Sequence, residues 1–134
     1  MKLIICLDEK KGMLFNGRRQ SRDRVLIENL ETYVAGAPVY MAPYSESLFL
    51  KSGVQRKICA EPLTEAPKGA YCFVECTDPA PFEKKLTEVV LYHWNRHYPS
   101  DLTFTMDMSG FRLTSTEEFV GSSHEKITRE VWKK

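Results

Sequence analysis

The sequence has no long apolar stretch and no marked excess of one charge. Its early apolar run, residues 3–7, ends at Asp8 and is too short for a signal-peptide core or a membrane span. Nineteen basic and 18 acidic side chains give a formal net charge of +1, so no overall field favours nucleic acid or an anionic membrane. We therefore expect a cytoplasmic protein with no membrane partner.

Cysteine is also scarce, and its four positions are Cys6, Cys59, Cys72 and Cys76. None forms the Cys-x-x-Cys pair of a structural zinc site, and a cytoplasmic location keeps thiols reduced. Cys72/Cys76 and His93/His97 have a four-residue spacing, which joins metal ligands only on a helix. Both pairs fall in expected strands, where their Cα atoms would lie about 13 Å apart. We expect four free thiols and no metal site.

The overall amino-acid composition is that of a globular protein. Over 134 residues, 43% are hydrophobic and only seven are glycine and seven proline, which predicts one domain spanning residues 1–134. Short apolar segments predict strands at 2–7, 38–41, 55–60, 70–76 and 89–94. Helical periodicity and capping residues predict helices at 21–34, 45–51 and about 78–86, with a loop at 61–69.

Two further segments, 111–120 and 126–133, are typical of strands, and the polar residues 121–125 between them predict a hairpin. Strand and helix alternation followed by a hairpin predicts an α/β fold. The expected architecture is a mainly parallel mixed sheet with helices on both faces and a C-terminal antiparallel hairpin.

Several strings resemble the dihydrofolate reductase family, in the same order along the chain. Residues 3–8 and 12–17 are similar to the family's first strand and to the loop over its active site. Residues 38–48 resemble its second strand and the helix that follows. Residues 86–113 resemble its late strand, the turn after it and the strand beyond. The resemblance covers nearly the whole chain and implies a divergent, shortened member of the dihydrofolate-reductase-like fold family.

The departures from that family lie where the reductases bind their cofactor. Their Gly-Arg-x-Thr turn, which binds dinucleotide phosphates, is Ala-Pro-Tyr-Ser at residues 42–45, and Pro43 offers no backbone donor. Their Gly-Gly pair beside the pyrophosphate is Glu75-Cys76 here, with a negative charge and two side chains. We expect no cofactor and no NADPH-dependent reductase activity.

One catalytic candidate comes from the same resemblance. The reductases carry an acidic residue in the first helix that serves in pterin protonation, and Asp23 lies about one residue from the matching position. Asp23 is therefore the candidate acid or base. Whether any reaction is catalysed stays open at this point.

The most unusual local feature is a run of four arginines within residues 18–24, just before the first expected helix. We predict that Ser21 caps this helix, which leaves the backbone donors at its start free to bind an anion. Arginine adds two-pronged recognition of phosphate or carboxylate. The alternative is a solvated basic turn that pairs with helix carboxylates such as Glu28.

The expected fold places this run near the carboxyl ends of the parallel strands, where open α/β sheets bind ligands. We predict an anionic or nucleotide-like small molecule there, bound by Arg18, Arg19, Ser21, Arg22, Asp8 and Asn16. The alternative function is a module that binds RNA or an acidic protein through the arginine run, without a reaction.

A hydroxyl, an imidazole and a carboxylate follow one another at residues 122–125 (Ser-Ser-His-Glu). This string suggests nucleophilic catalysis only superficially, because catalytic partners are brought together by the fold and adjacent turn residues rarely share one geometry. We expect a polar hairpin turn.

Overall fold

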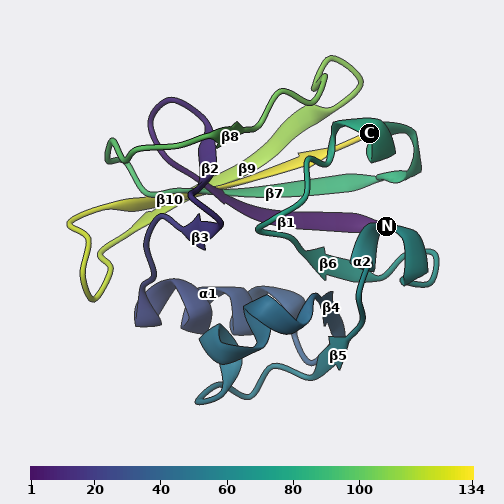
Figure 1. Cartoon of the computed structure of the whole chain (residues 1–134), viewed down its shortest axis with the longest axis horizontal. Helices are drawn as coiled ribbons and strands as arrows, with labels where there is room; N and C mark the ends of the chain where they lie inside the picture. Colours follow the sequence, from purple (N-terminus) through teal and green to yellow (C-terminus); the bar gives the residue numbers. More distant parts are fainter.

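The computed structural model describes residues 1–134 and is organised around a seven-stranded mixed sheet (Figure 1). The sheet order is β5-β4-β6-β1-β7-β10-β9. Its strands are β1 (Lys2–Leu7), β4 (Val39–Met41), β5 (Arg56–Ile58), β6 (Tyr71–Phe73), β7 (Glu88–His93), β9 (Arg112–Phe119) and β10 (Ile127–Lys133). The first five pair in parallel, and β10 runs antiparallel to both β7 and β9. The predicted parallel sheet with a C-terminal antiparallel hairpin is confirmed.

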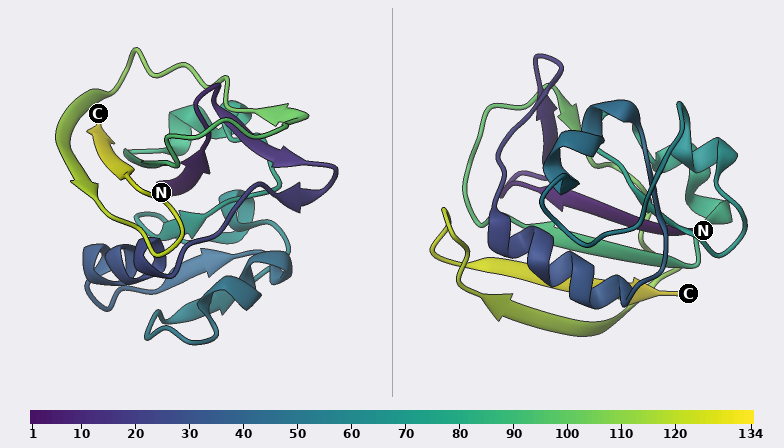
Figure 2. Two further views of the ribbon diagram at one scale, coloured as in Figure 1. Left: turned by 90° about the vertical axis from the view of Figure 1, so that its left-hand side faces the viewer. Right: turned by 90° about the horizontal axis from the view of Figure 1, so that it is seen from below.

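Helical segments cover both faces of this sheet, as predicted (Figure 2). The α-helix α1 (Arg24–Val34) and the 3-10 helix η1 (Pro43–Phe49) pack on one face, against Ile4 of β1. The short helix α2 (Pro62–Glu65) and the 3-10 helix η2 (Ala80–Lys85) lie on the other, against Leu3 and Ile5. The alternation of buried side chains along β1 explains why one strand serves two separate cores.

A second, small sheet was not predicted. It consists of β2 (Gly12–Phe15), β3 (Arg18–Arg19) and β8 (Leu102–Thr103), in the order β3-β2-β8. Asn16 and Gly17 have φ angles of 53° and 73° and form the tight turn between β2 and β3. An Asn-Gly pair with two positive φ angles is the preferred two-residue hairpin turn. The segment that we expected to be a loop is thus a hairpin.

Two other boundaries differ from the expectation. The predicted loop at 61–69 contains α2, which begins at Pro62, a residue favoured at a first helical position. The predicted strand at 70–76 is shorter, because the ladders to β1 and β4 both end at Phe73. None of the helices is long and apolar enough to cross a membrane.

The predicted cap of the first helix is wrong. Helix α1 begins at Arg24, and its N-cap is Asp23, whose side chain accepts hydrogen bonds from the backbone N–H groups of Val25 and Leu26. Ser21 lies two residues farther from the helix. Aspartate and serine are about equally good N-caps, so the residue type alone could not fix the boundary.

Candidate functional site

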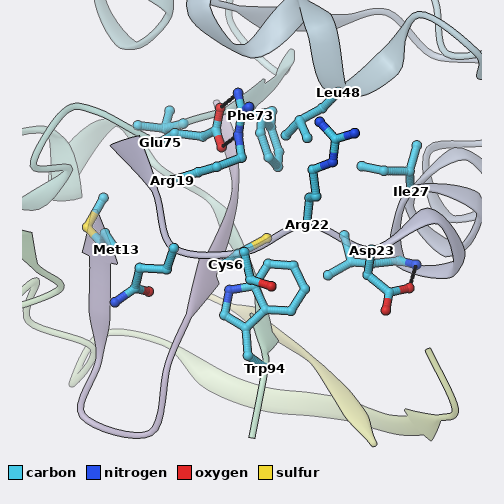
Figure 3. Close-up of a pocket in the computed structure, with 14 residues that line it drawn as sticks. Cys6, Met13, Arg19, Arg22, Asp23, Ile27, Leu48, Phe73, Glu75 and Trp94 are labelled. Carbon is cyan, nitrogen blue, oxygen red and sulfur yellow. Dashed lines mark hydrogen bonds and ion pairs between the residues drawn. The ribbon is translucent and has the colours of Figure 1, made fainter. Parts of the chain in front are cut away.

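A crevice opens at the carboxyl ends of β1 and β6, between α1, η1 and residues 19–23 (Figure 3). It encloses about 390 Å³ of empty space, part of which is open to solvent. Most of its wall is apolar and is formed by Cys6, Met13, Leu26, Ile27, Leu48, Phe73, Val74 and Trp94. An apolar crevice with few polar groups is the usual form of a small-molecule site.

Arg19 lies on the crevice wall, but its charge is already compensated. The Arg19 Nε and Nη2 atoms donate to the two carboxylate oxygens of Glu75 at 2.8 and 3.0 Å. The guanidinium also lies over the Tyr44 ring, 4.4 Å from its centre. Burial acts to lower the pKa of Arg19, and the bond to Glu75 outweighs burial and raises it. Arg19 therefore stays charged and paired.

Arg22 differs from Arg19 because it has no ion pair or side-chain hydrogen bond within the chain. Figure 3 shows its side chain extending among Leu48, Phe73 and Ile27. Arg22 is also exposed. It is thus the one cation of the crevice wall that is free to meet a ligand.

Two of the predicted ligand-binding residues lie outside this crevice, on the β2–β3 hairpin. Asn16 is at the tip of the turn, where its backbone N–H donates to Asp101 at 2.9 Å. Arg18 is exposed and does not line the crevice. Only Arg19, Ser21 and Arg22 of the predicted set come together there.

Asp8 is buried beneath the small sheet and serves as an anchor for several segments. Its carboxylate accepts hydrogen bonds from the backbone N–H groups of Lys10, Gly12 and Tyr98 and from the Gln20 side chain. Burial acts to raise the pKa of Asp8, but these hydrogen bonds outweigh it and lower the pKa. Asp8 does not line the crevice, and its hydrogen bonds hold these segments of the fold together.

The start of α1 is not available to an anion in the way that we expected. The backbone N–H of Arg24 donates to the Ser122 hydroxyl, and those of Val25 and Leu26 donate to Asp23. A carboxylate of the chain itself therefore occupies the positive end of the helix.

Asp23 has its carboxylate surrounded by donors. Besides its cap bonds it accepts from the backbone N–H groups of Ser122 and Ser123, at 2.9 and 2.8 Å, and it lies 2.9 Å from Nδ1 of His124. Burial acts to raise the pKa of Asp23, but the bonds from His124 and from the 122–123 backbone outweigh it and hold the pKa far below its usual range. The group is a carboxylate near neutral pH and carries no proton to donate.

His124 is a functional candidate that the sequence analysis set aside as part of a polar turn. It lies in the expected hairpin turn but is buried, and its ring stacks on Trp94 with centres 4.6 Å apart. Its Nε2 atom lies 3.0 Å from the Ser21 hydroxyl and 3.0 Å from the Tyr98 hydroxyl. Only the topology of the fold could have indicated this role, because the fold places the β9–β10 turn, which contains His124, beside the start of α1.

A second hollow, of about 340 Å³, lies next to the first at the end of β6. Glu61 and Glu75 line it, and no lysine or arginine does. Pro43, which begins η1 beside it, has no backbone N–H. These residues do not fit the phosphates of the dinucleotide that the sequence resemblance implies for the fold family.

Comparison with known proteins gives matches in structure but none in sequence. No family model matches the sequence, and neither does any curated protein. In structure, 247 chains match. One is a dihydrofolate reductase from Enterococcus faecalis complexed with NADP(H) and RAB-propyl, with a TM-score of 0.67 and 10% sequence identity over 98% of this chain and 94% of that chain. At that identity the match establishes the fold and nothing about the ligand.

Proposed function

We propose that this chain, which has the dihydrofolate-reductase-like fold, binds an anionic small molecule in the crevice at the ends of β1 and β6. The observation that carries the proposal is Arg22, an uncompensated cation at a crevice whose wall is mostly apolar. A guanidinium in this setting favours a carboxylate or a phosphate, which it binds through two hydrogen bonds. The apolar wall, including Phe73 and Leu48, suits a ring or a short chain attached to that anion.

The same proposal excludes NADPH-dependent reduction. By the sequence resemblance, Glu75 corresponds to the family's Gly-Gly pair beside the pyrophosphate, and its carboxylate is bound by Arg19 and by the Ser45 hydroxyl at 2.7 Å. A dinucleotide phosphate in the second hollow would meet Glu61 and Glu75, and no lysine or arginine lines that hollow to bind the phosphate. We expect no NADPH binding at micromolar concentration in a fluorescence titration.

A thermal-shift screen against nucleoside monophosphates, pterins, sugar phosphates and aromatic carboxylates tests the proposal, because a ligand of the native state raises its melting temperature. We expect at least one anionic compound to do so. Arg22→Ala should then weaken its binding about tenfold or more, as loss of a charged hydrogen bond does. Arg18→Ala is the matched control, since Arg18 is exposed but outside the crevice, and it should leave binding unchanged.

The alternative function, an RNA-binding or acidic-partner module, gives a different result in the same experiments. Many phosphate contacts would make the affinity fall steeply with salt, whereas one ion pair gives a shallow dependence. Equal losses in Arg18→Ala and Arg22→Ala, with a steep salt dependence for a short RNA, would replace the small-molecule proposal.

A further inference from the structure

Three side chains from distant segments form a continuous hydrogen-bonded series beside the crevice. The Ser21 hydroxyl lies 3.0 Å from Nε2 of His124, and Nδ1 of His124 lies 2.9 Å from a carboxylate oxygen of Asp23. The His124 and Asp23 side chains are only 2% and 0% exposed. Ser21 is half-buried and lines the crevice. Asp23 also lines the crevice, whereas His124 does not.

The protonation of this series is set by Asp23. An ionised carboxylate only accepts hydrogen bonds, so the Nδ1 atom of His124 must carry the proton that lies between them. When the imidazole is neutral, Nε2 is then the unprotonated nitrogen and can accept a hydrogen bond from the Ser21 hydroxyl. This is the tautomer that allows a histidine to take a proton from a serine nucleophile.

The His124 ring is held in this orientation from several sides. Trp94 stacks on it with an angle of 25° between the rings, and the hydrogen bonds to Asp23 from the backbone of Ser122 and Ser123 fix the carboxylate. A tie between the 121–124 turn and α1 would need only the Asp23–His124 contact. It does not require the Ser21 hydroxyl on the opposite nitrogen of the ring.

Two backbone N–H groups that follow Ser21 in the sequence are available as donors for a developing oxyanion. The backbone N–H groups of Arg22 and Asp23, the two residues after Ser21, make no hydrogen bond to any backbone carbonyl of the chain. The guanidinium of Arg22 is also unpaired at the crevice. Backbone donors beside the nucleophile are the usual means of stabilising a tetrahedral intermediate.

We propose that Ser21, His124 and Asp23 are a nucleophilic triad that hydrolyses a small anionic carboxylic ester held in the crevice. The inference rests on the proposed function only in placing the substrate in the same crevice. Cys6, the other nucleophile of the wall, is unsuited because burial, and then the charge of Glu75, raises the pKa of its thiol far above neutral.

In the first step the Ser21 Oγ attacks the ester carbonyl carbon while His124 Nε2 takes the hydroxyl proton. The carbon–oxygen bond to the alcohol then breaks, and the alcohol leaves with the proton from His124. In the second step a water molecule attacks the acyl-serine and gives its proton to His124. The acyl–oxygen bond breaks, the carboxylic acid leaves, and Ser21 recovers its proton. Asp23 orients the ring and stabilises the imidazolium throughout.

A second hydroxyl, that of Tyr98, shares the Nε2 atom with Ser21. It lies 3.0 Å from Nε2 and 3.4 Å from the Ser21 Oγ. Tyr98 does not line the crevice, whereas Ser21 does. Only the serine can therefore reach a bound carbonyl.

A fluorophosphonate probe tests the triad without knowledge of the substrate. Attack by Ser21 forms an oxygen–phosphorus bond and expels fluoride, which intact mass and peptide mapping detect. We expect one equivalent of probe on Ser21, and at least a hundredfold slower labelling in His124→Gln. Ser115→Ala is the matched control, because Ser115 is exposed on β9 and does not line the crevice. Its labelling should equal that of the wild type.

The triad is overturned if the folded protein is not labelled, if Ser123 or another residue takes the probe, or if Ser21→Ala is labelled as fast as the wild type. Ser21→Ala changes a small, half-buried side chain and keeps the test valid if His124→Gln does not fold. Thermal shift by the anionic compounds separates this result from the proposed function. If the protein binds the anionic compounds but is not labelled, the proposed binding function stands and the triad is wrong. If it is labelled but binds none of these compounds, the triad stands and the proposed binding function is wrong.

Discussion

Asp8 and Asp23 are both buried carboxylates, yet they connect to different parts of the molecule. Each accepts several backbone N–H groups, and each has a lowered pKa because hydrogen bonds outweigh burial. The partners of Asp8 are backbone groups and the Gln20 amide, none of which can take up a proton. Asp23 instead has an imidazole, which leads on to the Ser21 hydroxyl at the crevice. The neighbours of a buried carboxylate thus decide whether it only stabilises the fold or can also take part in proton transfer.

The largest expected effect comes from Asp23→Asn. An amide cannot hold the His124 proton on Nδ1, so the wrong tautomer faces Ser21 and fluorophosphonate labelling should fall by about 10³ to 10⁴-fold. Asp8→Asn should leave the labelling rate unchanged. Equal losses in the two variants would mean that labelling reports overall stability and would remove the distinction between the two carboxylates.

The second prediction concerns stability, where the two carboxylates should behave alike. Asp8→Ala and Asp23→Ala each leave buried backbone donors without a partner, and Asp23→Ala also removes the cap of α1. We expect each variant to lower the free energy of unfolding by about 2–4 kcal/mol. Urea unfolding measures this directly, and a loss below about 0.5 kcal/mol in either variant would contradict the assigned hydrogen bonds.

The third prediction is the pH dependence of that stability. Because the folded-state pKa values of Asp8 and Asp23 are lowered, the unfolded chain binds more protons than the folded one once the pH falls to about 4. Their contribution is present above that pH and is lost as the pH falls through the folded pKa values. The free energy of unfolding should decrease from pH 5 to pH 2.5, with a smaller slope in Asp8→Asn and in Asp23→Asn. An unchanged slope in both variants would contradict the lowered pKa values.

The smallest expected effect is that of Tyr98→Phe. It removes one of the two hydroxyls within reach of His124 Nε2 and leaves Ser21 alone there. We expect a stability loss of about 0.5–1.5 kcal/mol, as for one hydrogen bond, and a labelling rate no lower than that of the wild type. A large decrease in labelling would make Tyr98, and not Ser21, the hydroxyl that depends on His124.

The fold was readable from the sequence because apolar strands and helical periodicity depend on local pattern. Residues 2–7 and the hairpin strands at the C-terminus lie where they were predicted, and the resemblance to the dihydrofolate-reductase-like fold is confirmed. The cap of α1 was misplaced because Ser21 and Asp23 are equally suitable residue types. Residues 12–17 were predicted as a loop, because the short strands on either side of the Asn16–Gly17 turn carry too few residues to show a period.

The candidate site was less readable because its geometry depends on contacts between distant residues. His124 is separated from Asp23 and Ser21 by about 100 positions, and its sequence neighbours suggested only a turn. Likewise, the run of arginines gave no sign that Glu75 compensates Arg19 and leaves Arg22 free. Ion pairs between remote segments follow from the fold and leave no local pattern.

The outer strand β9 has a consequence for self-association. It forms one edge of the main sheet, is exposed along almost its whole length and curves strongly (Figure 2). Its pairing with β10 is interrupted by a shift of register between Val131 and Trp132. An added strand from another molecule would have to follow this curvature and place its side chains against Glu117 and Glu118. Curvature and the irregular register therefore protect an open sheet edge from recruiting further chains into an aggregate.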